Sequence, residues 1–126
     1  MTALGIIANE LNQIGVPYEF MRWTSTVEDT YFVGEYSETP TTSEDGYRES
    51  TLMVTGTTVG SWMDLEQHRA NIEHHFPRIH GLRLTTDTGT VVIFYDNSFP
   101  VPTGEADLKR IQINLLVKEW RNEQWV

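Results

Sequence analysis

Four histidines near the middle of the chain are the residues most suggestive of chemistry. His68 lies in a segment with helical spacing, and the stretch NIEHHFPRIHG, residues 71–81, contains the other three. A helical zinc site needs two histidines four residues apart. His68 and His75 are separated by about 10 Å along a helix, which is too far for two ligands of one ion. The spacing therefore predicts no metal site, and we interpret the histidines as solvated or edge-packing residues, with Asp64 as an i+4 partner for His68.

Other catalytic patterns are equally weak. The chain contains no cysteine, so a thiol nucleophile, a disulfide and a thiolate metal site are excluded. The glycines lack the spacing of a phosphate-binding or dinucleotide-binding loop, and GTTVG, residues 56–60, only superficially resembles a nucleophile elbow. Paired acids fall in expected loops, where solvation is their usual state. We predict no catalytic residue, no cofactor and no enzymatic activity.

The chain is acidic and has the length of one domain. Its 126 residues carry 9 Lys and Arg against 18 Asp and Glu, a net charge of -9, and we expect a single domain over 1–126. This net negative charge disfavours binding to nucleic acid, whose phosphates are also negative. A surface lined with carboxylates that DNA passes without binding remains a possible role. Residues 1–15 lack the pattern of a signal peptide, and no apolar run is long enough to span a membrane. We expect a soluble protein used inside a cell, with no membrane partner.

Hydrophobic spacing predicts two helices and about six strands. One helix is expected near 4–14, between Thr2 and Gly15, and another near 63–76, between Ser61 and Pro77. Strands are expected over residues 18–24, 30–37, 51–59, 82–86, 90–95 and 108–120. Residues 97–104, with two prolines, are expected to form a surface connection. The predicted fold class is α+β, with a mostly antiparallel or mixed sheet of about six strands flanked by two helices.

The segment ETPTTSEDGYRES, residues 38–50, has no apolar period. A loop of this length in a small domain is usually functional or disordered. Tyrosine, arginine and tryptophan are the residue types most often found at interface hot spots, whereas we expect Trp23 and Trp120 to serve packing. The residues expected at an interface are Glu38, Glu44, Asp45, Tyr47, Arg48, Trp62 and Trp125.

Short signatures in a particular order cover most of the chain. They are Trp23 with YFVGEY (31–36), LMVTGT (52–57) leading into Trp62, Leu65, Glu66, Ile72 and Phe76, then Phe94, Tyr95, Pro100, Pro102 and residues 108–120. In this order and at this length the chain resembles the tail-completion or tail-terminator proteins of long-tailed bacteriophages and prophages, also labelled head-tail joining or minor capsid proteins. None of the signatures is a catalytic fingerprint.

The resemblance implies a structural role in virion assembly. Such proteins cap the head-proximal end of the tail tube as a ring, commonly of six subunits, and join it to the connector that closes the head. Implied partners are further copies of the chain, the tail tube protein and the head-closure or connector protein, with DNA passing through the lumen without specific binding. The implied location is the tail or neck of the virion, and the host cytoplasm during assembly.

Two alternatives stay open. One is a small-molecule-binding or enzymatic domain of cone-like α+β form, in which Tyr18, Trp23 or Tyr95 lines a pocket and His68 or a carboxylate acts as a base. A bound small molecule would favour that alternative. The other is a head-closure stopper or another neck protein, which differs only in the ring that each surface binds.

Overall fold

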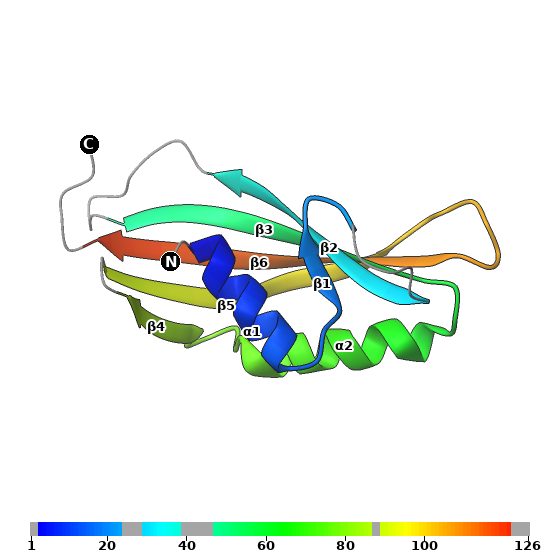
Figure 1. Ribbon diagram of the computed structural model, residues 1–126, viewed down its shortest axis with the longest axis horizontal. Coiled ribbons are helices and arrows are strands. Elements are labelled where there is room, and N and C mark those ends of the chain that lie inside the picture. The colour runs from blue at the N-terminus through cyan, green and yellow to red at the C-terminus, as the bar shows by residue number, and fades with distance from the viewer. Residues whose placement is uncertain (1–2, 24–28, 39–46, 87–88, 122–126) are drawn as a thin grey trace.

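The computed structural model describes residues 3–23, 29–38, 47–86 and 89–121. These residues form one six-stranded sheet with two helices, so the predicted α+β class is confirmed (Figure 1). In chain order the elements are α1 (Ala3–Gln13), β1 (Tyr18–Phe20), β2 (Thr30–Glu38), β3 (Tyr47–Thr58), α2 (Trp62–His75), β4 (Leu82–Thr86), β5 (Gly89–Val101) and β6 (Lys109–Arg121). Within the described residues, no helix is long and apolar enough to cross a membrane.

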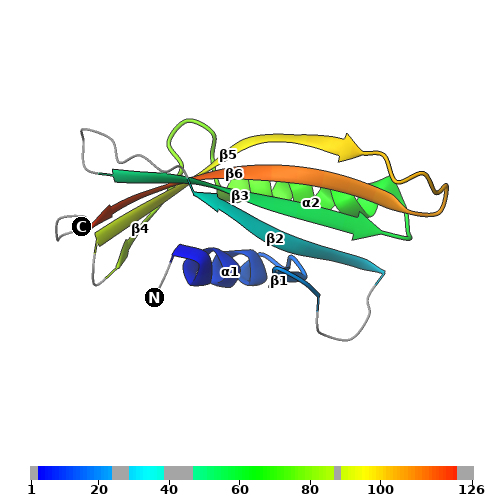
Figure 2. The same cartoon turned by 90° about the horizontal axis from the view of Figure 1, so that it is seen from above.

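The sheet has the strand order β1-β2-β3-β6-β5-β4. β1 runs parallel to β2, and every other neighbouring pair is antiparallel, as a mixed sheet requires. The two central strands pair over their whole length, from Tyr47 opposite Trp120 to Thr58 opposite Lys109. β5 shifts its register on β6 between Tyr95 and Asn97. The long strands twist strongly along their length (Figure 2).

Both helices pack on one face of this sheet, which we call the inner face. Strand side chains alternate between the two faces, so every second residue of β2, β3, β5 and β6 points inward. α2 begins where the Ser61 N–H donates to the Asp64 carboxylate at 3.1 Å, as the predicted capping residues require. A single buried cluster joins the helices to the strands, and it includes Ile7, Leu11, Leu65, Ile72, Phe76, Phe32, Leu52, Val54, Ile93, Ile113, Leu115 and Val117.

Two expected connections are shorter than predicted. β2 extends to Glu38 and β3 already begins at Tyr47, so the predicted 38–50 loop is wrong at both ends. The reason is that the long β6 gives the polar start of β3 a strand partner. The predicted 97–104 connection is also wrong, since β5 continues to Val101. Pro100 is tolerated there because β4 stops pairing at Ile93, which leaves this part of β5 paired only with β6, and an edge strand accepts proline.

The predicted strand over 18–24 is shorter than expected as well. β1 ends at Phe20, and Met21 adopts a positive φ of 73°, a conformation that turns a chain out of a strand. Its N–H still donates to the Gly34 carbonyl at 2.9 Å. The first strand therefore covers only a short part of the edge of β2.

Candidate interaction surface: the outer face of the sheet

The second face of the sheet, which we call the outer face, has no covering helix in the described part of the chain. Its side chains alternate with the buried ones on the same strands. Several large apolar residues lie there without being fully buried: Val33, Met53, Phe94 and Leu116 are partly exposed, and Phe99 is 44% exposed. A soluble antiparallel sheet commonly shows polar residues on such a face. The apolar content makes this face the candidate site.

An aromatic cluster marks one end of the outer face. The rings of Tyr47 and Trp120, directly opposite each other on β3 and β6, are 5.0 Å apart. The Lys118 ammonium lies 5.1 Å from the centre of the Tyr47 ring and 5.6 Å from that of Phe94. Glu49 is the ladder partner of Lys118. Aromatic and cationic groups held this way are typical anchors of protein interfaces.

Polar side chains in the middle of the outer face bond to one another. The Gln112 side chain donates to Asn114 Oδ1 at 3.0 Å, and Asn114 donates to Asn97 Oδ1 at 2.8 Å. The Arg110 Nε donates to the Thr57 hydroxyl at 3.4 Å. A polar group that already has a partner costs less to bury than one that loses its water without replacement. This part of the face is therefore prepared for contact with a protein.

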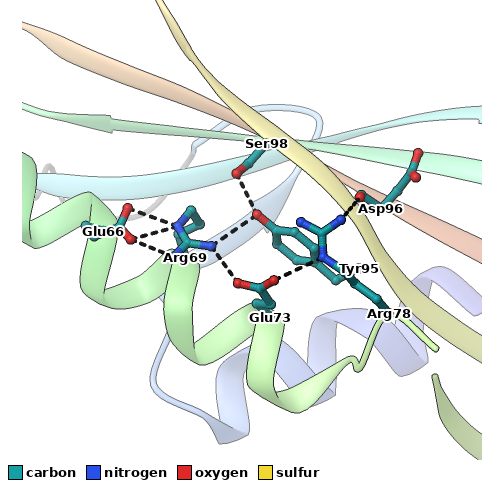
Figure 3. Close-up of polar contacts among 7 residues, drawn as sticks. All are labelled: Glu66, Arg69, Glu73, Arg78, Tyr95, Asp96 and Ser98. Atoms are coloured by element: carbon teal, nitrogen blue, oxygen red, sulfur yellow. Dashed lines mark hydrogen bonds and ion pairs between the residues drawn. The ribbon is translucent and has the colours of Figure 1, made fainter. Parts of the chain in front are cut away.

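On the inner side, a polar network joins α2 to β5 (Figure 3). Arg69 bonds Glu66 through its Nε at 2.9 Å, Glu73 through its Nη1 at 2.8 Å, and the Tyr95 hydroxyl at 3.3 Å. Tyr95 in turn donates to the Ser98 hydroxyl. Because Tyr95 and Ser98 lie on either side of the register shift, the network fixes both parts of β5 to the helix.

Arg78 completes this network from the turn after α2. Its Nε donates to Glu73 at 3.1 Å, its Nη1 donates to the Asp96 carbonyl at 3.0 Å, and its guanidinium lies 4.9 Å above the Tyr95 ring. The hydrogen bond from Arg69 lowers the pKa of Glu66 and is also the largest cause of the lowered pKa of Glu73. The same contacts, with that to Glu66 the largest, raise the pKa of Arg69. All these charges are satisfied by one another, so the network is a structural brace.

The predicted interface residues do not form one surface. Tyr47 lies on the outer face, whereas Arg48 points to the opposite side by strand alternation. Trp62 is 44% exposed, but it starts α2, the helix that packs on the inner face. Glu38 is the last residue of β2. Glu44, Asp45 and Trp125 lie outside the described residues.

Sequence reasoning missed the partners of Tyr47 on the outer face. The sequence predicts that Trp120 serves packing, and its ring does pack against that of Tyr47, tilted by 43°, at the partly exposed end of the central strands. One signal is present in the sequence: between Gln112 and Lys118, Leu116 is the apolar exception among the polar alternate residues of the last strand. In the structure it lies on the outer face beside Phe94, its ladder partner.

The histidines occupy separate environments. The His68 ring meets Phe32 edge-on at 5.4 Å, and its buried Nδ1 has no hydrogen-bond partner. Burial lowers the pKa of His68, and Asp64 acts in the opposite direction. His75 Nε2 lies 3.2 Å from a carboxylate oxygen of Glu10, which links α2 to α1. Among the described residues, no three potential metal ligands converge.

Two hollows bear on the small-molecule alternative. One of about 300 Å³ lies between α1 and β4 and is lined by residues such as Glu10 and Leu84. Another of about 270 Å³ lies beside the register shift of β5 and includes Tyr95. Tyr18 instead lies in the core, where burial raises its pKa to about 12. Trp23 packs 5.6 Å from the Tyr31 ring. Of the three aromatic residues proposed for a pocket, Tyr95 borders a hollow, whereas Tyr18 and Trp23 border neither of these two.

Comparison with known proteins relates the fold to a virus-like particle. No protein-family model and no curated protein sequence matches the chain. A chain in the solved structure of the virion of a native gene transfer agent particle superposes with a TM-score of 0.67, at 12% identity, over 86% of this chain and 83% of the other. The chain has the fold of a virion chain. At this identity the likeness shows the fold, and it is consistent with the resemblance to phage tail-completion proteins.

Two further solved structures are similar to the chain. One, of a protein without a descriptive name, has a TM-score of 0.68 and 14% identity over 98% of this chain and all of the other, 100%. The other is the core region of PilO from the type IV pilus system of Pseudomonas aeruginosa, with a TM-score of 0.46, 15% identity and coverage of 95% and 97%. The PilO score is too low to support a conclusion about this chain.

Proposed function

We propose that the chain is a structural, non-enzymatic subunit of a phage-like virion, and more narrowly that it is a tail terminator. The observation that carries the proposal is the fold shared with the gene transfer agent virion chain over most of both chains. The order of sequence signatures supports the same class of protein. In this role the chain caps the head-proximal end of the tail tube and joins it to the head connector.

The physical character of the surface supports an assembly role. Apolar and aromatic side chains remain partly exposed on the outer face, and its central polar groups are bonded to one another. The polar cluster on α2 is a closed ion-pair network, which gives it the character of a brace and not of a catalytic site. Contacts with other virion proteins are therefore the activity that the described residues favour.

The proposed partners are the tail tube protein, the head-closure or connector protein and further copies of the chain, six in a ring. A ring requires two different complementary patches on each subunit. The chain carries a net charge of -9, and carboxylates lining a lumen repel DNA phosphates and let the genome pass without binding. The protein then resides in the tail or neck of the virion, and in the host cytoplasm before assembly.

The test mixes the purified chain with a candidate tail tube protein. Light scattering gives the mass of the chain alone and in the mixture, and negative-stain microscopy images the products. Rings, or tubes of uniform length with one closed end, are the expected result. A chain that ignores the tube and binds a small molecule would overturn the proposal in favour of a ligand-binding domain.

A deletion of residues 41–46 sharpens the test. In the sequence, these six residues fall between Glu38, the last residue of β2, and Tyr47, the first residue of β3. We expect the shortened chain to fold, with an unchanged urea midpoint, and to lose capping. Normal capping by the folded deletion variant would remove this segment from the assembly contacts.

A head-closure stopper is the alternative within the same class. It differs from a terminator in its binding partner, because it meets the connector and not the tail tube. Pull-down of the tagged chain with each purified partner separates the two. If the tagged chain retains the connector and not the tail tube protein, the stopper role replaces the terminator role.

A further inference from the structure

Charge is divided across the outer face of the sheet. Among the described residues that pair with a neighbouring strand, the acidic residues of this face lie on β1, β2 and β3. The basic residues of this face lie on β6 and β4. The boundary runs between β3 and β6, the two central strands. Three acids lie on one side of it and three bases on the other, so the ladder charges of this face balance although the chain is strongly acidic, and Glu49 and Lys118 are direct partners across the boundary. The residues are Glu19, Glu35 and Glu49 on one side, and Lys118, Arg110 and Arg83 on the other.

We propose that a second copy of the chain docks face to face on this surface, related by a two-fold axis that runs parallel to the strands between β3 and β6. A rotation of 180° about that axis exchanges the two sides of the boundary. Each β3 residue then lies opposite the residue that is its own ladder partner on β6, contributed by the second copy. Glu49 meets Lys118, and Tyr47 meets Trp120.

The same rotation brings residues of β2 opposite residues of β5. Phe94 then meets Ser37, and two other rows join pairs of larger side chains. β2 and β5 lie at equal distances from the boundary, one strand beyond the central pair. Val33 is in the same cross-strand row as Phe99, and Tyr31 is in the same row as Val101. The axis therefore places each of these apolar residues against an apolar residue of the second copy, twice per dimer. Contacts that repeat in this way define an isologous interface.

The charge pattern selects both the axis and the occupant. A two-fold axis across the strands would lay the acidic half of one copy on the acidic half of the other, and such like-charge contacts are destabilising. Two copies with a net charge of -9 repel each other, and a contact face with balanced charges adds less to that repulsion than an acidic face would. Sheets packed with aligned strands lie about 10 Å apart, which leaves room for interdigitating side chains.

Burial of the centre of this interface leaves its amide side chains partnered. Gln112, Asn114 and Asn97 already bond to one another. The half-buried Met53 and Leu116 lie among these polar groups. The pairing concerns the free chain and is independent of the proposed virion role, because it is measured without any virion partner.

The test is sedimentation equilibrium of the full chain over a range of concentrations. The wild-type protein is expected to form dimers. Lys118→Glu brings four carboxylates together at the axis, because Glu49 and the new Glu of each copy converge, and it should raise the dissociation constant at least about tenfold. The double variant Glu49→Lys with Lys118→Glu restores two charges of each sign and should restore the dimer.

The matched control is Arg22→Glu, which changes net charge by the same amount at an exposed residue after β1. It should leave the dissociation constant within about twofold of wild type, a small free-energy change. Urea unfolding of each variant shows that its fold is intact. A wild-type chain that stays monomeric, a dimer insensitive to Lys118→Glu, or a double variant no better than the single one would each overturn the proposal.

Discussion

The two faces of the sheet are built from the same strands but follow different physical rules. On β6, Ile113 and Leu115 are fully buried on the inner face, whereas the alternate residues Asn114 and Leu116 are only partly buried. The inner face is closed by two helices and carries the core. The outer face combines apolar, aromatic and mutually bonded polar side chains. Strand alternation thus separates the residues that hold the fold from those available for recognition.

The faces also differ in how their charges are used. On the helix side, Arg69, Glu66 and Glu73 form a closed set of ion pairs within one chain. On the outer face, Glu49 and Lys118 are ladder neighbours, and the lysine lies over the aromatic rings of Tyr47 and Phe94. The first arrangement satisfies its charges internally. The second presents charges of both signs to a neighbouring molecule.

The largest effect should come from truncating the inner face. Leu115→Ala should lower the free energy of unfolding by about 2–5 kcal/mol, because it opens a cavity in the core. Leu116→Ala, the adjacent outer-face change, should cost less than about 1 kcal/mol, because solvent already reaches that side chain. Urea unfolding of the two variants measures the difference. Equal losses would contradict the division of the strand into a core face and a contact face.

A smaller effect should follow from cutting the brace between α2 and β5. Arg69→Met removes bonds to Glu66, Glu73 and Tyr95 and should lower the free energy of unfolding by about 1–2 kcal/mol, since part of the network is exposed to solvent. The pKa values of both carboxylates should then rise toward their ordinary value, which NMR titration measures. Arg22→Met, a change at an exposed arginine, is the control. Unchanged carboxylate pKa values would show that the network does not form in solution.

The smallest effect should appear as a pH dependence on the helix side. Burial lowers the pKa of His68 in the folded chain, so the unfolded chain binds the proton more tightly. Stability from this residue is present above the unfolded pKa of about 6.5 and is lost as pH falls through the folded value. Glu66 and Glu73 titrate at lower pH and do not obscure this window. His68→Phe should flatten the unfolding midpoint between about pH 7 and pH 5; an unchanged slope would contradict burial of the neutral ring.

Local patterns in the sequence predict the frame of the fold well. Apolar residues at helical spacing locate both helices, and alternation along the last strand is enough to assign Ile113 and Asn114 to opposite faces. The positions where strands end and the chain turns are harder to predict, because the length of a strand depends on partner strands that are distant in the sequence. Tyr47 is in a strand only because Trp120 lies opposite it, and Pro100 is tolerated only because that part of β5 is an edge.

The same reason limits prediction of the candidate site. Residue type nominates Tyr47 as an interface residue, and it lies partly exposed on the outer face, but its aromatic and cationic neighbours come from β5 and β6. Neither the pairing of Glu49 with Lys118 nor the division of charge at the centre of the sheet can be read from one stretch of sequence. Both follow from the strand order β1-β2-β3-β6-β5-β4. Leu116, the exception to an alternating pattern, is one local sign of an apolar outer face.

Cysteine cross-linking tests the contrast between the faces most directly, because the natural chain has no cysteine. Asn114→Cys places a thiol on β6 beside the proposed axis, and Gln67→Cys places one at an exposed position on α2. With a short bis-maleimide at low protein concentration, we expect covalent dimers from the Asn114 variant and very few from the Gln67 variant. Equal yields from both, or no dimer from the Asn114 variant, would contradict the assignment of the outer face as the association surface.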